Sequence, residues 1–522
     1  MYRFGPRGHF THRVASVEEV KATVGELELD SPDGRLLIGT TVAGSAVAML
    51  TATVVNVALP TLAGDLGASS GQLQWVANGY LLALASLILI GGSLGDRFGR
   101  VRVYRAGIAS FAVASLLCAI APTIELLIAA RFLQGIGAAL FTPGSLAIIE
   151  ATLRSSDRGR GVGQWSGLGG VAGAIGPLLG GVLVDVSWRL VFIVNIPIAI
   201  VVIVISVKIP ESFDPESAKH PLDIPGAVLT AVTLGGASYA LIEGPSAGFG
   251  TALVGLAIVA TVVGAIALVW AENRREHPML AFDLFSIRSF LAANVVTVFV
   301  YAGLGLVFFL LTVQLQVSLG WSPLIAGAAL LPITLMLLTG SAKGGELAQR
   351  FGPRWPLTFG PLLIAAAMLL YSRVGPGDNY VTDVLPGTLL FGLGLVLSVA
   401  PVTASALGAA PDERAGAASG INNAVSRTGQ LLAIAAVPPL VGLTGDALND
   451  PELLTAGFDN AMFVGAALLC LGAVFAAVLY RPEQSDPRPP HNETRARTSN
   501  TASPLVGGRS PYSGPDRSLG QS

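Results

Sequence analysis

Two arginines, Arg131 and Arg427, stand inside otherwise apolar stretches of this 522-residue chain. A cation in the middle of a bilayer costs at least about 2.5–3.5 kcal/mol, so each guanidinium needs a polar cavity or a partner. Arg427 lies about 17 Å deep at 1.5 Å per residue, too deep to reach the interface easily. Such arginines either line a polar path or bond to backbone carbonyls between helices. They cannot carry protons, because arginine titrates above about 12.

Amides in other apolar stretches would line the same path, or would instead bond neighbouring helices together. They are Asn56, Gln134, Gln164, Asn294, Asn422 and Asn423. No acid or histidine falls at mid-membrane. Glu125 and Asp185 lie near the outer ends of their segments, and partial burial there would raise the pKa of either carboxyl. We expect one of these two to carry protons if protons are transported.

A charged turn at 92–102, with the sequence GSLGDRFGRVR, separates two apolar stretches, and a weaker copy follows at 344–354. Its glycines permit a tight bend, and a carboxylate at Asp96 could meet the positive end of a helix. We expect a conformational switch, formed by Gly92, Asp96, Arg97, Gly99 and Arg100, with Arg102 beside them. The alternative is a simple anchor of positive residues.

The composition is that of an integral membrane protein, because 52% of residues are hydrophobic and only 12% are charged. The sequence predicts an all-α fold with 14 transmembrane helices. They run near 36–58, 75–95, 103–121, 124–147, 161–183, 189–208, 224–242, 251–270, 290–313, 323–341, 356–372, 383–404, 416–441 and 461–480.

Lysine and arginine set the expected orientation. Of the 31 such residues, all but Arg131, Arg189, Arg373 and Arg427 fall in the two tails or in loops on the same side as the tails. We therefore expect a multi-pass protein of the plasma membrane with both termini in the cytoplasm. The absence of an apolar run before residue 36 argues against a cleaved signal peptide.

The two charged turns follow the second and tenth predicted helices, so a duplication of six helices leaves two helices over. The predicted organisation is a cytoplasmic tail (1–35), a six-helix half (36–208), two inserted helices with linkers (209–289), a second six-helix half (290–480) and a disordered tail (481–522). A duplicated helical membrane protein is most often a transporter.

The motifs resemble those of the major facilitator superfamily, in particular the fourteen-helix drug:proton antiporters of the EmrB/QacA type. The charged turn is similar to that family's GxLxDRxGRxR loop, Arg131–Gly137 to its RxxQGxG motif, and Gly176–Gly181 to its GPxxGG motif. The resemblance implies export of drugs or other small amphipathic compounds by alternating access, with protons as the coupling ion. It also implies a switch role for the residues of the third motif, Gly176, Pro177, Gly180 and Gly181.

One position departs from the family pattern. Thr51 stands in the first helix where the family usually has an aspartate near the arginine of the fourth helix. Thr51 would then line the path beside Arg131, and two arginines without this acid would favour an anionic or neutral substrate over the usual lipophilic cation.

Two other functions stay open: a dedicated exporter of one endogenous metabolite, for example an acidic one, and a non-transporting membrane receptor or scaffold. The chain has no GxxxxGK[ST] loop for ATP, no clustered catalytic set and no basic nucleic-acid-binding domain. Cys118 and Cys470 suggest neither a disulfide nor a metal site. We expect no enzyme activity, no cofactor and no obligatory protein partner, only the bilayer and a small-molecule substrate.

Overall fold

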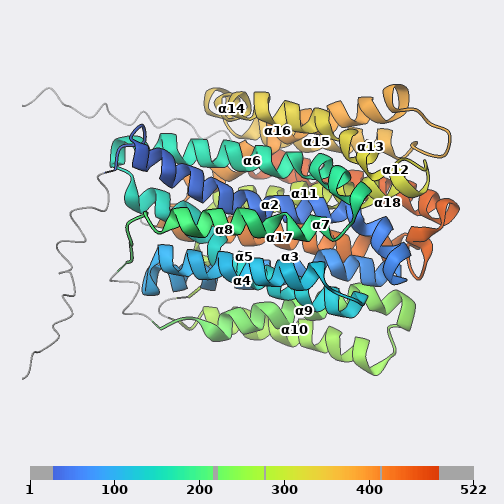
Figure 1. Cartoon of the computed structure of the whole chain (residues 1–522), viewed down its shortest axis with the longest axis horizontal. Coiled ribbons are helices and arrows are strands. Elements are labelled where there is room, and N and C mark those ends of the chain that lie inside the picture. Colours follow the sequence, from blue (N-terminus) through green and yellow to red (C-terminus); the bar gives the residue numbers. More distant parts are fainter. Residues whose placement is uncertain (1–26, 215–220, 276–277, 412–413, 481–522) are drawn as a thin grey trace, which may run out of the picture. The chain divides into compact units, whose positions relative to one another are not determined.

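The computed structural model describes residues 27–214, 221–275, 278–411 and 414–480. The predicted disordered tail and most of the predicted amino-terminal tail lie outside these residues. Apart from one β-bridge between Leu27 and Leu153, the described chain forms helices and their connections (Figure 1).

The amino-terminal half contains α2 (Pro32–Leu66), α3 (Ser70–Phe98), α4 (Arg100–Ala119), α5 (Ile124–Thr152), α6 (Ser155–Val186), α7 (Leu190–Ile193) and α8 (Asn195–Ser206). Local sequence explains where these helices begin and end. Ser31 caps α2 before a proline in its first turn, and Gly67 ends it at φ 63°. Ser69 and Gln72 form a reciprocal capping box on α3.

The segment predicted to be inserted forms α9 (Ile224–Ala247) and α10 (Ala252–Glu272), followed by the short η2 (Phe282–Ser286). The carboxy-terminal half contains α11 (Arg288–Leu306), η3 (Val307–Leu311), α12 (Thr312–Val317), α13 (Pro323–Ala328), α14 (Leu331–Phe351), α15 (Arg354–Tyr371), η4 (Tyr380–Val384), α16 (Leu385–Ala409), α17 (Ala415–Leu440), η6 (Ala447–Asn449) and α18 (Pro451–Leu479).

Eleven helical spans in the described residues are long and apolar enough to cross a membrane, fewer than the fourteen predicted. The three remaining predicted segments are helical as well, as α6, α7 with α8, and α17. The helix α8 is short, and α17 carries the polar residues Asn422, Asn423 and Arg427. Within α6, the stretch Val171–Val186 is apolar.

Several helices join the halves: α3 packs against α17, α6 packs against α13 and α14, and α2 contacts α12. The inserted helices pack against each other, and α9 also contacts α3 and α17. Only 17% of the most apolar window of α10 is buried within the protein. A helix this apolar and this exposed requires lipid around it.

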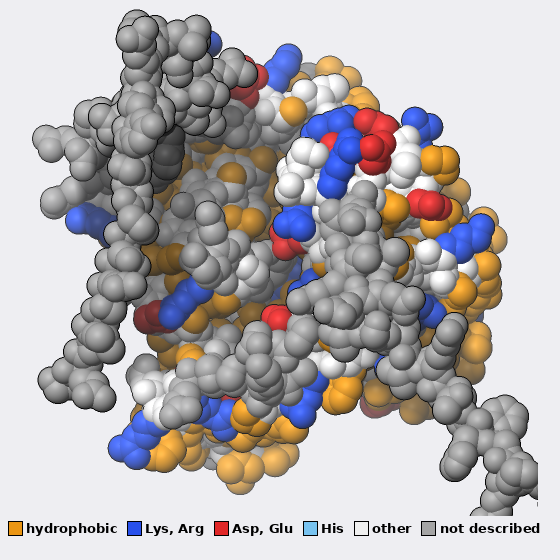
Figure 2. Space-filling model, turned by 90° about the vertical axis from the view of Figure 1, so that its left-hand side faces the viewer, with side chains coloured by type: hydrophobic (Ala, Val, Ile, Leu, Met, Phe, Trp, Pro, Cys, Tyr) orange, Lys and Arg blue, Asp and Glu red, His pale blue; other side chains and the backbone are white. Residues whose placement is uncertain are grey.

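We call the end of the bundle where α2 begins the near end, and the opposite end the far end. Hydrogen bonds join the two halves at the far end, where Ser70 N donates to Gly445 O at 2.7 Å and Leu448 N to Ser70 Oγ at 3.1 Å. Figure 2 views the near end, on which basic and acidic side chains gather among hydrophobic ones. These hydrogen bonds between the halves therefore lie at the end of the bundle opposite the one shown in Figure 2.

Candidate functional site

A cavity of about 160 Å³ lies between the two halves of the bundle. The amino-terminal half lines it with side chains from α2, α3 and α5 and with Gly173 of α6, and the other half lines it with residues from α11, η3, α14, α16 and α17. Most of these side chains are apolar. The polar groups come from Thr53, Asn56, Tyr80, Arg131, Tyr301, Arg427 and Gln430. A mostly apolar cavity with few polar groups is typical of small-molecule sites.

Arg131 is fixed in a network of hydrogen bonds and is only 1% exposed. Its Nε donates to Val76 O at 2.8 Å and its Nη1 to Gln134 Oε1 at 2.5 Å. Gln134 Nε2 donates in turn to Ser115 Oγ at 2.8 Å. The guanidinium also lies 4.6 Å from the centre of the Tyr80 ring. Arg131 thus lines the cavity and also bonds a backbone carbonyl of a neighbouring helix.

Arg427 reaches the same cavity with far fewer bonds. Its Nη1 donates to Gln430 Oε1 at 3.4 Å, a long contact. Its Nε is buried and has no acceptor. No aspartate or glutamate lines this cavity in the described chain. A buried charged donor without an acceptor is costly, so the Arg427 guanidinium is poorly compensated within the protein.

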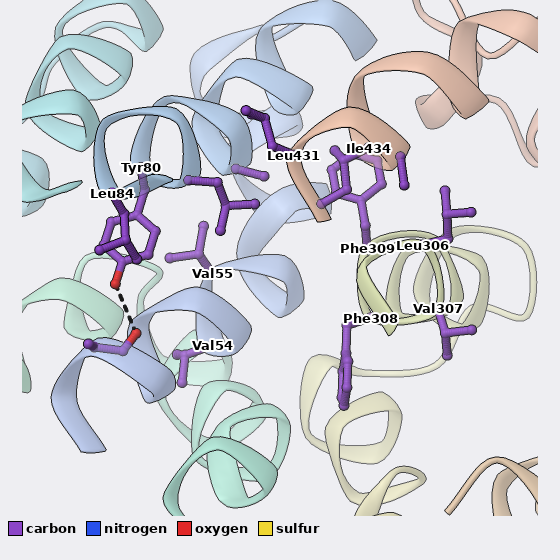
Figure 3. Close-up of a cluster of buried hydrophobic side chains, with 14 of the residues drawn as sticks. Val54, Val55, Tyr80, Leu84, Leu306, Val307, Phe308, Phe309, Leu431 and Ile434 are labelled. Atoms are coloured by element: carbon purple, nitrogen blue, oxygen red, sulfur yellow. Dashed lines mark hydrogen bonds between the residues drawn. The ribbon is translucent and has the colours of Figure 1, made fainter. Parts of the chain in front are cut away.

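Aromatic side chains from both halves surround the arginines. Tyr80 comes from α3 and donates to Ala48 O on α2 at 3.1 Å, while Phe308 comes from the other half (Figure 3). Phe308 belongs to η3, a π-helical turn within the long helical span from Arg288 to Val317. Such turns often mark functional sites, because the extra residue re-aims side chains.

Several residues predicted to line the path lie outside this cavity. Thr51 is buried and donates to Asn195 Oδ1 at 3.2 Å, so it does not stand beside Arg131 in the cavity lining. Asn422 Nδ2 bonds Asn294 Oδ1 at 3.2 Å and Thr297 Oγ1 at 3.0 Å. These contacts fit the alternative of bonding between helices.

Two more predicted amides lie elsewhere. Gln164 is exposed on α6 and does not line the cavity, and Asn423 bonds the carbonyl of Ser419 on its own helix. Of the predicted path residues, the cavity lining includes Asn56, Arg131 and Arg427, and Gln134 supports Arg131.

The two predicted proton carriers are exposed at the far end. Glu125 Oε1 accepts from Gln72 Nε2 at 3.0 Å, and Asp185 Oδ1 accepts from Leu324 N at 3.4 Å. Neither carboxylate lines the cavity. The partial burial expected from the sequence is absent at both, because each acid stands in a terminal turn of its helix that faces outward.

In the charged turn, Asp96 pairs with Arg100 at 2.7 Å instead of meeting a helix terminus. Arg100 Nη1 also donates to Ala147 O on α5 at 3.4 Å. Glu211 takes the predicted role of Asp96, because it accepts from Val101 N at 2.9 Å and Arg102 N at 3.0 Å at the start of α4. This N-terminal carboxylate complements the helix dipole.

Other switch residues have tight surroundings. Gly99 has φ 105°, and a side chain there would contact the Glu211 carboxylate. Gly92 faces the Pro143 ring, and the Arg97 guanidinium lies 5.6 Å from the centre of the Phe98 ring.

The glycines of α6 allow neighbouring helices to approach its backbone closely on two of its faces. A side chain at Gly176 or Gly180 would meet α2, at Thr53 and Val54. A side chain at Gly181 would meet the backbone of Pro323, and one at Gly327 would meet the carbonyl of Pro177. These α6–α13 contacts bring the two halves to backbone distance at the far end.

Sequence reasoning did not predict Tyr80, Tyr301, Phe308 or Gln430. One signal was present, because Arg427-x-x-Gln430 has the same spacing as Arg131-x-x-Gln134. Residues three positions apart lie next to each other on the same face of a helix, so each arginine can hydrogen-bond the glutamine of its own helix. The aromatic residues have no comparable signal in so apolar a chain.

The comparisons with known proteins agree with this architecture. The chain is 34% identical to the multidrug resistance protein Stp of Mycobacterium tuberculosis over 78% of this chain and 76% of that protein. It is 34% identical to the methylenomycin A resistance protein of Streptomyces coelicolor, over 87% of this chain and 94% of that protein. The puromycin resistance protein pur8 of Streptomyces alboniger is also 34% identical, over 89% and 96% of the two chains.

Solved structures share the fold at low identity. A D-xylose-proton symporter superposes with a TM-score of 0.59 at 15% identity, covering 86% of this chain and 98% of that one. A peptide transporter POT in complex with sulfate gives 0.61 at 15% identity, covering 88% and 98%. Residues 41–434 match the family model described as Major Facilitator Superfamily. The chain therefore belongs to the major facilitator superfamily and is a multi-pass membrane transporter.

Proposed function

We propose that this protein is a secondary active transporter that exports drugs or other small amphipathic compounds across the plasma membrane by alternating access, in exchange for protons. The observation that carries the proposal is the mostly apolar cavity built from both halves, whose joining hydrogen bonds lie at the far end. Relatives named for resistance to multiple drugs, methylenomycin A and puromycin support the direction and the class of substrate.

The proposed topology has fourteen crossings with the near end in the cytoplasm. The helix α6 supports a crossing, because Asp157 near its start bonds Leu29 at the near end, and Asp185 near its end bonds Leu324 at the far end. Of the lysines and arginines outside the apolar stretches, all but Arg189 and Arg373 lie in the tails or in loops that would face the cytoplasm, as the positive-inside rule requires.

Proton exchange needs a titratable group that alternates between the two sides. Arginine cannot serve, and no carboxylate lines the cavity in the described chain. Glu125 and Asp185 remain the proposed carriers, and they would act at the far end, where Asp185 already bonds α13 of the other half. The protonation of the carrier would then depend on the contact between the two halves and not on direct contact with the substrate.

Two regions would form the conformational switch. At the far end, Gly181 and Gly327 permit the α6–α13 contact that closes the cavity on that side. At the near end, the Asp96–Arg100 pair and the Glu211 cap hold the turn between α3 and α4. Opening one end while the other closes requires both regions to break and reform.

The test is drug resistance and efflux in a bacterial host that lacks its own exporters. Cells making the protein should tolerate higher concentrations of several compounds, with methylenomycin A, puromycin and tetracenomycin C in the panel because relatives are named for them. Resistance to a single compound would indicate a dedicated exporter, and unchanged tolerance to every compound would contradict the proposal.

A matched pair of variants controls for folding and expression. Gly327→Trp should abolish resistance, because its side chain would overlap the backbone of α6. Gly255→Trp should leave resistance unchanged, because a side chain at this glycine of α10 meets open space. Equal resistance from both variants would show that the far-end contact is not needed for transport.

A further inference from the structure

We infer that Arg427 binds an anionic group of the substrate, so that this transporter exports organic anions in preference to organic cations. This inference rests on the proposed function and names the charge class of its substrate. It also assigns Arg427 as the residue that determines charge specificity, with Arg131 contributing to the positive potential of the cavity.

The first observation in favour of an anionic substrate is the charge of the cavity. Arg131 and Arg427 both line it, and the described lining contains no aspartate or glutamate to balance them. The low-dielectric walls strengthen the field of two uncompensated cations. A cationic substrate would be repelled, whereas an anionic group would compensate charge that the protein leaves unbalanced.

The hydrogen bonds distinguish the two arginines. Arg131 has close acceptors in Val76 O and Gln134 Oε1, so its donors are largely used within the protein. Arg427 has one long bond to Gln430, and its buried Nε has no acceptor. An oxyanion with two oxygens could accept from the two terminal nitrogens of Arg427 at once, in the forked geometry typical of guanidinium–carboxylate pairs.

The surroundings of Arg427 define the rest of the ligand. Tyr80, Tyr301 and Phe308 line the same cavity, together with aliphatic residues such as Leu304 and Ile434. Aromatic rings pack well against planar apolar groups. The fitting ligand is therefore a small amphipathic compound with a planar or aliphatic body and one carboxylate, sulfonate or phosphate group.

The experiment compares three probes with one skeleton: naphthalene-2-sulfonate, (2-naphthyl)trimethylammonium and neutral 2-naphthamide. Their binding to the full-length protein in lipid nanodiscs is measured by titration calorimetry. The sulfonate should bind at least about tenfold more tightly than the trimethylammonium compound. The variant Arg427→Gln should weaken sulfonate binding about tenfold or more and leave 2-naphthamide unchanged, and Arg427→Lys should recover part of the loss.

The control variant is Arg288→Gln, which removes one positive charge from the near end, where Arg288 bonds Leu479 O at 3.0 Å outside the cavity. It should bind the sulfonate as the native protein does. Thermal unfolding of each variant establishes that it is folded. Equal or tighter binding of the cation, or sulfonate binding that survives in Arg427→Gln, would overturn the anion assignment while leaving export intact. Failure of the folded native protein to bind any probe or to confer resistance would overturn the proposed function, and the inference with it.

Discussion

At the scale of single residues, the two cavity arginines have different structural roles. Arg131 is almost fully buried and bonds one carbonyl and one amide, whereas Arg427 is partly exposed to the cavity and bonds one amide at long distance. The same residue type can therefore stabilise the fold in one half and remain available to a ligand in the other.

We expect Arg131→Ala to lower stability more than Arg427→Ala. Removing Arg131 leaves Val76 O and Gln134 Oε1 without their donor, and each buried group left unpaired costs about 1–3 kcal/mol. Removing Arg427 removes a donor that is already unpaired. Thermal unfolding in detergent measures the difference, and an equal or larger loss in Arg427→Ala would contradict these roles.

Thr51→Val tests whether Thr51 belongs to the substrate path. The structure gives Thr51 a single bond to Asn195 Oδ1, so this nearly isosteric change should cost only about 1 kcal/mol of stability. Drug export should stay at the native level, because Thr51 does not line the cavity. A change of substrate range in Thr51→Val would show instead that Thr51 meets the substrate in another conformation.

At the scale of elements, Glu211 connects the linker after α8 to the start of α4. It accepts from two backbone N–H groups of α4, and Ser212 O accepts from Arg100 N at 2.8 Å. Glu211 and Ser212 thus hold the charged turn in place, although both lie outside the 92–102 motif.

Glu211→Ala should weaken this cap by about 1 kcal/mol and reduce efflux, because the Asp96–Arg100 pair loses its support. Efflux rates and melting temperatures in the host membrane measure both effects. Glu452→Ala is the matched control, since Glu452 is exposed in the first turn of α18 at the far end. Native efflux in Glu211→Ala would contradict a role for this cap in transport.

The residues before α2 dock onto the start of α6 through Asp157. Its Oδ2 accepts from Leu29 N at 3.1 Å, and Arg154 Nε lies 2.9 Å from the same oxygen. These two donors, the backbone N–H first, hold the pKa of Asp157 below its usual range.

Because this pKa is lowered by folding, the ionised carboxylate stabilises the protein above the pKa of unfolded aspartate, about 3.9, and the effect is lost only as the pH falls further. Asp157→Asn should therefore lower the melting temperature by a similar amount at pH 8 and at pH 5. The exposed Asp30→Asn serves as control and should have a smaller effect. A deficit in Asp157→Asn that disappears by pH 5 would contradict the lowered pKa.

The sequence predicted an all-helical membrane fold and singled out two of the residues that line the cavity. Apolar length locates helices well, and the cost of a buried charge singled out Arg131 and Arg427, which the cavity lining includes. The sequence did not predict the surroundings of Asp96, Glu125 and Asp185. The hydrogen-bond partner of an exposed acid depends on which loops fold against it. Glu211 lies far from the charged turn in sequence, so no local pattern could pair them.

At the scale of the whole molecule, the two halves and the inserted pair have separate roles. The halves enclose the cavity, whereas α9 and α10 pack at the side of α3 and α17 and present most of their surface outward. A second cavity, of about 230 Å³, lies where this pair meets α3 and α17, and it is lined mainly by apolar side chains. The inserted pair thus braces the contact between the halves that α3 makes with α17.

The inferred charge of the substrate determines how the membrane potential acts on transport. Each elementary charge that crosses the membrane contributes about 2.3 kcal/mol per 100 mV. Export of a monoanion in exchange for one proton moves two charges in the direction that a negative cell interior favours, so the membrane potential drives it strongly. Exchange of a monovalent cation for one proton would move no net charge.

The most direct test of the account is uptake of naphthalene-2-sulfonate into everted membrane vesicles energised by respiration. Nigericin removes the pH gradient and valinomycin with potassium removes the potential. We predict uptake that persists with nigericin, falls with valinomycin and is lost in Arg427→Gln. Uptake of (2-naphthyl)trimethylammonium alone, or of neither probe, would contradict the account.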